Sequence, residues 1–250
     1  MNIEKRKEKE LEKKEKRRKE LTMLETKNLI KNFGGKTALN DVSFLIEPGK
    51  TYLLLGPNGS GKTTWMKTAA SLSKPTSGSV LWNGIPVGVE SRKEISYMPT
   101  ESFFYSWMTV ADVGDYCADF FEDFDQGQYR DMIKDMELPA DAKVKSLSSG
   151  MNAKLRLSAA ISRKARVYLL DEPLNGIDLV ARDAVMKAVI SVMSPETTVV
   201  ISSHLVEEVE SFVSTAIFLR SGKLLEITDT EELRIRTGKS LADRYRELMQ

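Results

Sequence analysis

Short apolar runs alternate along the chain with longer segments in which apolar side chains recur at helical spacing. From Met23 onward, nine runs have the length and composition of β-strands, at 26–33, 42–47, 51–56, 79–83, 94–98, 166–171, 197–203, 215–220 and 223–227. This alternation is typical of a mostly parallel sheet covered by helices on both faces. The turn sequences at 47–50 and 220–223 separate strands near either end of the series.

The stretch between Met98 and Arg166 has a different pattern, because no strand-like run occurs in it. Segments 110–124, 128–138 and 150–165 instead have helical periodicity. We therefore expect a helical insert within an α/β core.

Composition limits the number of domains and indicates the redox compartment. The 250 residues include 37 basic and 36 acidic side chains and are 41% hydrophobic, as expected for a globular protein of one or at most two domains. The single cysteine, Cys117, forms no internal disulfide, which favours a reducing compartment, and we expect it to be a small core residue. No apolar run approaches the roughly 20 residues of a membrane-spanning helix.

Charge is concentrated at the start of the chain. Residues 1–21 contain ten Lys or Arg and six Glu, a local excess of four positive charges, with almost no apolar side chains. We expect residues 1–22 to form a charged leader that is frayed or disordered in isolation. Two interpretations fit it: a solvated leader, or a segment attracted to anionic lipid or nucleic acid.

The strand at 51–56 runs into a glycine-rich loop and then a helical segment. Residues 56–64, GPNGSGKTT, match the G-x-x-x-x-G-K-[ST] phosphate loop in its required context. Such a loop curls so that its N–H groups surround an anion, and the next helix points its positive end at the same place. The expected roles are Lys62 on the terminal phosphates, Thr63 on magnesium and Thr64 on the inner phosphate. The nucleotide-binding residues predicted here are Gly56, Asn58, Gly59, Ser60, Gly61, Lys62, Thr63 and Thr64.

A second buried strand ends in two adjacent carboxylates, Asp171 and Glu172. Because successive side chains of a strand point in different directions, Asp171 suits the magnesium shell while Glu172 reaches a water aligned on the terminal phosphate. The only histidine, His204, directly follows the strand at 197–203. Ligands of parallel sheets gather at the carboxyl ends of strands, so we expect His204 on the same rim, contacting the terminal phosphate and its attacking water.

Taken together with LSSGM at 147–151 and NGID at 175–178, these motifs closely resemble the nucleotide-binding subunit of ATP-binding cassette (ABC) transporters over residues 23–250. The resemblance implies that Ser148, Ser149 and Gly150 cap the phosphate held by the opposite subunit, which suits donors at a helix N-terminus. It also implies that Asp178 lies at the subunit seam and that Phe33 lies under the adenine ring. A core aromatic at a strand end is the alternative for Phe33.

The implied fold class is α/β: a P-loop NTPase (RecA-like) core with a mostly parallel sheet, an antiparallel β edge and a helical subdomain. The implied ABC ATPase domain spans 23–250, with its core at about 23–98 and 166–229, the helical subdomain at about 99–165 and C-terminal helices at about 230–250. The implied cofactors are ATP and Mg²⁺. The implied partners are a second copy or a closely related subunit and separate transmembrane permease subunits, which would hold the chain at the cytoplasmic face of the membrane.

The chain departs from the family pattern at the strand ending at Met98. The family has a glutamine where this chain has Thr100, which is followed by Glu101. Threonine is too short to reach the magnesium, so three alternatives are open: water fills the gap, Glu101 substitutes, or the site is looser. In LSSGM, Ser149 and Met151 likewise stand where a second glycine and a glutamine are common. The metal ligands implied are Thr63, Asp171 and Thr100.

Aromatic side chains are dense just after this point, in residues 101–110. In the family a groove here receives a cytoplasmic helix of the membrane subunit. We consider two roles for the aromatic group, anchoring that helix or packing the core of the insert. The group consists of Phe103, Phe104, Tyr105 and Trp107.

The sequence after Met151 and the chain end at 238–250 are more similar to bacterial exporters of antibiotics, peptides or lipids than to importers. Two rival functions differ in class. One is a soluble ABC ATPase acting on ribosomes or nucleic acid, which usually carries two cassettes or a long coiled-coil insertion. The other is a nucleotide sensor without turnover, against which Glu172 and His204 argue. We expect an ATP-hydrolysing transport subunit, catalysed by Glu172 and His204, without a nucleic-acid partner.

Overall fold

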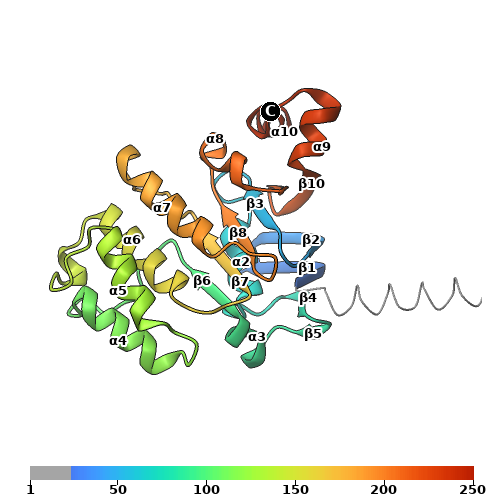
Figure 1. Cartoon of the computed structure of the whole chain (residues 1–250). Coiled ribbons are helices and arrows are strands. Elements are labelled where there is room, and N and C mark those ends of the chain that lie inside the picture. The colour runs from blue at the N-terminus through green and yellow to red at the C-terminus, as the bar shows by residue number, and fades with distance from the viewer. Residues whose placement is uncertain (1–23) are drawn as a thin grey trace, which may run out of the picture.

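The computed structural model describes residues 24–250, and the predicted charged leader at 1–22 lies outside the described residues. Two sheets and a set of helices make up this part of the chain (Figure 1). Within residues 24–250, no helix combines the length and the apolar character needed to cross a membrane.

A six-stranded sheet forms the centre of the molecule, in the order β10-β9-β3-β8-β7-β6. Five strands are parallel and β10 pairs with β9 antiparallel. Every residue of β7 and β8 is buried, which explains why both are continuous apolar runs. The strands are β3 (Thr51–Leu55), β6 (Ile95–Met98), β7 (Val167–Asp171), β8 (Thr198–Ser202), β9 (Thr215–Arg220) and β10 (Lys223–Asp229).

A second, antiparallel sheet has the order β2-β1-β4-β5. Its apolar face shares one core with helix α2 (Lys62–Ala69) and one face of the central sheet. Trp65 of α2 is fully buried there, 5.0 Å from the ring of Phe44, and its indole N–H donates to Thr26 Oγ1 at 2.9 Å. The strands are β1 (Leu24–Phe33), β2 (Lys36–Ile46), β4 (Ser77–Trp82) and β5 (Ile85–Pro86).

Helices cover the opposite face of the central sheet and share its second core. Helices α4, α5 and α6 lie together at one side of the molecule, and α9 and α10 lie at the other (Figure 1). The helices and helical turns are α3 (Val89–Glu94), α4 (Val110–Phe120), α5 (Gln126–Asp135), η1 (Val144–Ser146), α6 (Ser149–Ile161), α7 (Leu179–Ser191), α8 (Val206–Val209), η2 (Glu210–Phe212), α9 (Thr230–Thr237) and α10 (Leu241–Met249).

All nine predicted strands are present, and within the described residues no strand lies between β6 and β7. The sequence missed β5, which is only two residues long, and the first half of β2, at 36–41, which is mostly exposed. Both are extended through pairing, with β4 and β1 respectively. Helices lie on both faces of the central sheet, as expected. On one face, helix α2 shares the core with the antiparallel sheet.

Candidate functional site

The loop between β3 and α2 is built on glycines that no other residue replaces without strain. Gly56 has a φ of +159°, and a Cβ there would lie 2.2 Å from the carbonyl oxygen of Leu219. Gly61 has a φ of +107°, and its Cβ would lie 2.7 Å from the carbonyl oxygen of Ala38. The loop therefore follows a tight curve against β9 and β2.

Ser60 fixes this loop to its surroundings. Its carbonyl oxygen accepts from the N–H of Gly222, whose own carbonyl accepts from the N–H of Asn40. Its hydroxyl is buried and has no hydrogen-bond partner among residues 24–250. A buried hydroxyl without a partner is uncommon and leaves a donor for a ligand.

The N-terminus of α2 differs from those of the other long helices. Among described helices of eight or more residues, it alone has no side-chain cap. Its first turn also has no acidic residue. The N–H groups at this end are therefore not occupied by a side chain, and the helix dipole favours an anion there.

Lys62 is the first residue of α2 and is only 6% exposed. Its ammonium group donates to the Gly56 carbonyl oxygen at 2.7 Å and lies 3.7 Å from Glu172 Oε1. A buried ammonium group needs such partners, because leaving water is costly. The positive charge of Lys62 is therefore held against the backbone of the glycine loop itself.

Asp171 and Glu172 end β7, and β8 positions both. Asp171 is fully buried, and its carboxylate accepts from Ser202 Oγ at 2.6 Å and from the Tyr97 hydroxyl at 3.4 Å. Burial, followed by the charge of Asp171, raises the pKa of Tyr97, so this hydroxyl stays protonated and donates.

The backbone of Glu172 has a φ of +51°, which is rare for a residue with a long side chain. Its N–H donates to the Ser202 carbonyl at 3.1 Å and to the Ser202 hydroxyl at 2.9 Å, and these bonds hold the strained backbone in place. The carboxylate of Glu172 is turned toward Lys62 and His204.

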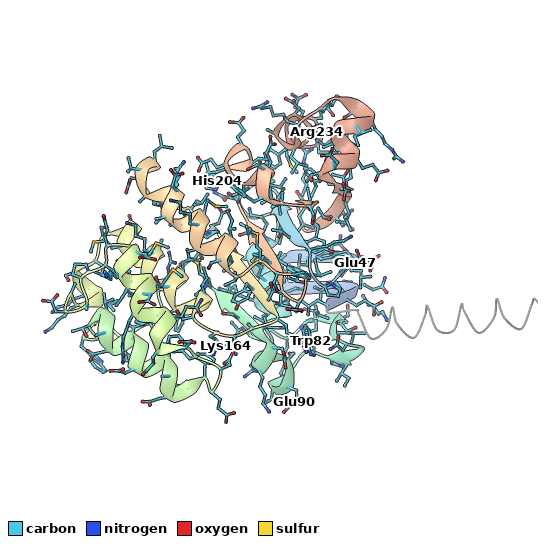
Figure 2. The ribbon with its side chains drawn as sticks, in the orientation of Figure 1. Glu47, Trp82, Glu90, Lys164, His204 and Arg234 are labelled. Atoms are coloured by element: carbon cyan, nitrogen blue, oxygen red, sulfur yellow. The ribbon has the colours of Figure 1, made fainter. Side chains whose placement is uncertain are left out.

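His204 follows β8 and lies close to Glu172. Its Nδ1 is 2.8 Å from Glu172 Oε2, and about half of its side chain is exposed. In Figure 2 it lies beside α8, which begins at Val206. The lone histidine is therefore on the same rim as the glycine loop, as the sequence predicted.

One cavity of about 580 Å³ brings these groups together. The predicted residues on its walls come from β1, the glycine loop, the end of β6, β7 and β8. They are Phe33, Asn58, Gly59, Ser60, Gly61, Lys62, Thr63, Thr64, Thr100, Glu172 and His204. We refer to it as the nucleotide pocket.

Phe33 and Thr100 both line this pocket, Phe33 from the end of β1 and Thr100 from the segment after β6. Phe33 is 54% exposed at the end of β1, so it is not the core aromatic of the alternative interpretation, and Lys31 Nζ lies 4.7 Å from its ring centre. Thr100 lines the pocket, whereas Glu101 lines a different cavity. The alternative in which Glu101 replaces the missing glutamine therefore has no support in this structure.

Predicted residues from two other helix ends do not line the nucleotide pocket. Ser148 caps α6, its hydroxyl accepting from the Met151 N–H at 3.2 Å, and Asp178 caps α7 by accepting from the Ala181 N–H at 3.0 Å. These two ends are neighbours, since a Cβ on Gly150 would lie 2.8 Å from the carbonyl oxygen of Gly176. The remaining predicted residues outside the pocket lining are Gly56, Ser149 and Asp171.

The four aromatic residues after Thr100 divide between the two roles considered for them. Phe104 is 7% exposed and belongs to the core shared with the helices. Phe103, Tyr105 and Trp107 are all more than half exposed, and the rings of Tyr105 and Trp107 stack at 5.9 Å.

Sequence reasoning missed several residues of the site. Lys36, Ala38 and Asn175 line the nucleotide pocket, and Ser202 orients both Asp171 and Glu172. Asn175 stands within the NGID motif, and Lys36 is a basic residue just after Phe33, so a local signal existed for both. Ser202 had none, because its partner is 31 positions earlier in the chain.

Comparisons with known proteins agree with this geometry. The family described as ABC transporter matches residues 39–175. The ABC transporter ATP-binding protein YtrB of Bacillus subtilis is 32% identical over 215 residues, 85% of this chain and 74% of the relative. The lantibiotic transport ATP-binding protein SrtF of Streptococcus pyogenes is 30% identical over 205 residues, 81% of this chain and 89% of the relative. A solved structure of the ATP-binding subunit of an ABC transporter superposes with a TM-score of 0.81 at 24% identity, over 92% of this chain and all of the other.

Proposed function

The chain belongs to the ABC transporter family and is an ATP-binding subunit that hydrolyses ATP; from this premise we propose that two copies share two sites and power export through separate membrane subunits. The second copy is an identical or closely related chain. The cargo is a peptide, an antibiotic or a lipid-like molecule.

One observation carries the shared site. The nucleotide pocket has a cation, a carboxylate and a histidine on its walls, but its lining does not include Ser148, Ser149 or Gly150. These residues supply hydroxyl and N–H donors at the start of α6, where the helix dipole also favours an anion. In the proposed head-to-tail dimer, each copy presents this end to the triphosphate in the pocket of the other, and Asp178 lies at the seam between them.

Within one pocket, each residue has a defined task toward ATP. Lys62 neutralises the terminal phosphates, and the N–H groups of the glycine loop and the uncapped end of α2 bind the inner ones. The Ser60 hydroxyl, buried and unpartnered among residues 24–250, is one further donor in this cradle. The exposed ring of Phe33 stacks on the base with little selectivity, because every base offers a π face.

Glu172 is the proposed general base. Its carboxylate accepts the proton of the water that attacks the terminal phosphate, and a positioned base of this kind contributes about 10²–10⁴ in rate. His204, 2.8 Å from Glu172, orients that carboxylate and reaches the same water and phosphate. Lys62, 3.7 Å from the same carboxylate, offsets its charge.

A magnesium ion fits the donors that are present. Thr63 lines the pocket, and Asp171 is a buried carboxylate held by Ser202 and Tyr97. Within residues 24–250, no three His, Cys, Asp or Glu side chains form a group that could hold a metal ion. Magnesium in nucleotide sites is commonly held by one or two protein ligands together with substrate phosphates. When bound, the ion supplies neutralisation of phosphate charge. Thr63 and Asp171 would hold it, with Thr100 close by in place of the family's glutamine.

The membrane partner has a proposed docking place in a second cavity of about 610 Å³, which we call the docking cavity. It shares no lining residue with the nucleotide pocket, although Thr100 and Glu101, one on each cavity, are adjacent in sequence. The exposed rings of Phe103, Tyr105 and Trp107 are the proposed anchors for a cytoplasmic helix of that partner. This contact would keep the chain at the cytoplasmic face of the membrane.

Export is supported by a relative named for it, the Nod factor export ATP-binding protein I of Burkholderia lata. SrtF is named for lantibiotic transport, and the chain spans most of its length. We carry the peptide, antibiotic or lipid-like class of cargo over from such relatives, since in this arrangement the membrane subunits select the cargo.

Co-purification from the native membrane tests this proposal. The tagged full-length chain is expected to bring down a polytopic membrane protein, and ATPase activity is expected to rise cooperatively with protein concentration because each site needs two chains. Activity strictly proportional to the concentration of a monomer, with no membrane protein retained, would contradict it.

A further inference from the structure

The docking cavity combines apolar walls with an excess of positive charge. Its apolar side comes from β6, α4 and α6, including Ile95, Phe121 and Ala160. Its charged lining consists of Lys67, Arg92, Arg156, Arg163 and a single carboxylate, Glu101.

One of these cations is fully used by the fold. Arg163 is paired with Asp123 at 3.1 Å, donates to the carbonyl oxygens of Ile95 and Arg92, and lies 4.2 Å from the centre of the Phe121 ring. Its guanidinium N–H groups are already bonded within the protein, so we treat it as a structural residue of the cavity wall.

Arg156 is different. It is only 7% exposed, and its Nε and Nη1 donate to the carbonyl oxygens of Asn152 at 3.2 Å and Pro99 at 3.0 Å. Among the residues described, no carboxylate lies within 4.0 Å of it, and Asp171 and Glu101 act on its charge only from beyond contact distance. Its Nη2 has no hydrogen-bond partner there. A guanidinium group remains charged under all ordinary conditions, and a buried charge without a carboxylate in direct contact is costly.

The other charged residues of the cavity do not pair with Arg156 at contact distance. Arg92 and Lys67 are exposed and have no ion pair among residues 24–250, and Arg92 donates only to Ser71. Glu101 also has no ion-pair partner within 4.0 Å in that range. The cavity therefore suits a ligand that is apolar on one side and carries a negative charge.

We propose that the docked helix of the membrane subunit is amphipathic and places a carboxylate against Arg156. This rests on the proposed function, because it specifies the partner that the docking cavity accepts. The apolar side of the helix packs on the cavity walls, and its Asp or Glu gives Arg156 a carboxylate in direct contact.

The position of Arg156 gives this contact a route to the ATP site. Arg156 belongs to α6, whose N-cap is Ser148, and it donates to the carbonyl oxygen of Pro99, the residue before Thr100. A carboxylate bound to Arg156 therefore contacts a side chain that joins α6 to the segment leading to Thr100 in the nucleotide pocket. Arg156 is in this sense a positioning residue.

The test uses the full-length chain and three labelled amphipathic peptides of about 16 residues, long enough to form a helix. They share apolar Phe and Leu positions and differ only in a central Glu, Gln or Lys. Binding is measured by fluorescence anisotropy at low and at moderate salt. The Glu peptide is expected to bind about 10-fold more tightly than the Gln peptide, with the Lys peptide weakest.

The Arg156→Gln variant is expected to abolish the preference for Glu over Gln, whereas Arg130→Gln, an exposed charge on α5 outside the cavity, is expected to keep it. Equal binding of the Glu and Gln peptides by the unmodified chain would overturn the proposal even if Arg156→Gln does not fold. A preference that survives in a folded Arg156→Gln variant would overturn it as well, as would absence of binding.

Two further measurements separate the possible failures. Vesicles with and without phosphatidylglycerol are tested against the same variants, and Arg156-dependent binding of the anionic vesicles in place of the Glu peptide would overturn the proposal. ATPase activity is assayed on the same unmodified chain. Activity without peptide discrimination rejects only the carboxylate contact, whereas a chain that does not hydrolyse ATP rejects the proposed function itself.

Discussion

The N-termini of α2 and α6 both have backbone N–H groups without partners inside the helix, and the two ends differ in how these groups are used. At α2 the end has no side-chain cap, Lys62 is buried under the loop, and the pocket walls surround it. At α6 the end is capped by Ser148, its first turn has no acidic residue, and it lies outside the pocket lining. The first end lies in a pocket that can hold an anion, whereas the second offers donors with no pocket of its own. This difference is the reason for proposing that two copies form one working site.

The largest effect is expected at the α2 end. Lys62→Ala removes the buried cation and leaves the Gly56 carbonyl without its partner, so kcat/KM for ATP should fall about 10⁴-fold, combining lost binding and lost charge at the transition state. Phosphate release and binding of a fluorescent ATP analogue measure both. Lys187→Ala, an exposed cation on α7, should leave both unchanged, and a comparable loss in that variant would show that folding and not chemistry had failed.

Glu172→Gln should separate chemistry from binding within the same pocket. The side chain keeps its size and loses its basicity, so turnover should fall about 10³-fold while ATP stays bound. Single-turnover hydrolysis measures the loss of turnover, and retention of labelled ATP on a desalting column measures the remaining binding. The exposed Glu196→Gln is the matched control. Equal loss of ATP binding and turnover would assign Glu172 to binding instead.

The α6 end is tested by Ser148→Asp. Aspartate caps a helix as well as serine does, so the stability of α6 should not change, but a carboxylate facing a triphosphate should lower activity about 10²-fold. Ser148→Asn, a neutral cap, should lose far less. Thermal unfolding of both variants checks that the cap is kept.

Mixing these variants decides whether the comparison is right. Lys62→Ala and Ser148→Asp are each expected to have little activity, yet a mixed dimer of the proposed kind contains one site with an intact loop and an intact α6 end. Equal amounts should therefore restore about a quarter of the normal activity, by the symmetry of a two-site dimer. If no activity is recovered after subunit exchange, the α2 end and the α6 end of the same chain would have to form the site, which contradicts the shared arrangement.

The smallest effect is expected at Phe33. Loss of a stacking ring should raise KM about 10-fold in Phe33→Ala, since base stacking contributes about 1–3 kcal/mol. Because stacking discriminates weakly among bases, the KM values for ATP and GTP should rise together. Phe33→Tyr keeps the ring and should be close to the unmodified chain. A change of kcat with constant KM would exclude a role in base binding.

The parts of this molecule that the sequence predicted well are those set by local geometry. The glycine loop, Lys62 and the two carboxylates follow from the backbone needs of a few adjacent residues, and the buried strands follow from continuous apolar runs. His204 follows from its place at the carboxyl end of a parallel strand. The presence of Phe33 and Thr100 in the same pocket was implied only by resemblance, because these residues come from strands far apart in the chain.

What escaped prediction depends on packing between distant segments. Ser202 has no sequence signal, although its hydroxyl bonds both Asp171 and Glu172. Arg156 stands in a helix of ordinary composition and becomes unusual only because α6 buries it beside Pro99. Phe103 and Phe104 are adjacent and chemically identical, yet one is exposed and the other buried, because the loop there has no regular period.

The left-handed backbone of Glu172 sets a limit on how stable this protein can become. Glycine or asparagine adopts a φ of +51° more readily, so either replacement is expected to relax the main chain while removing the proton acceptor. A selection for heat resistance alone would thus favour a dead enzyme at this position. Thermal robustness in this protein has to be sought elsewhere in the fold, away from the turn that follows β7.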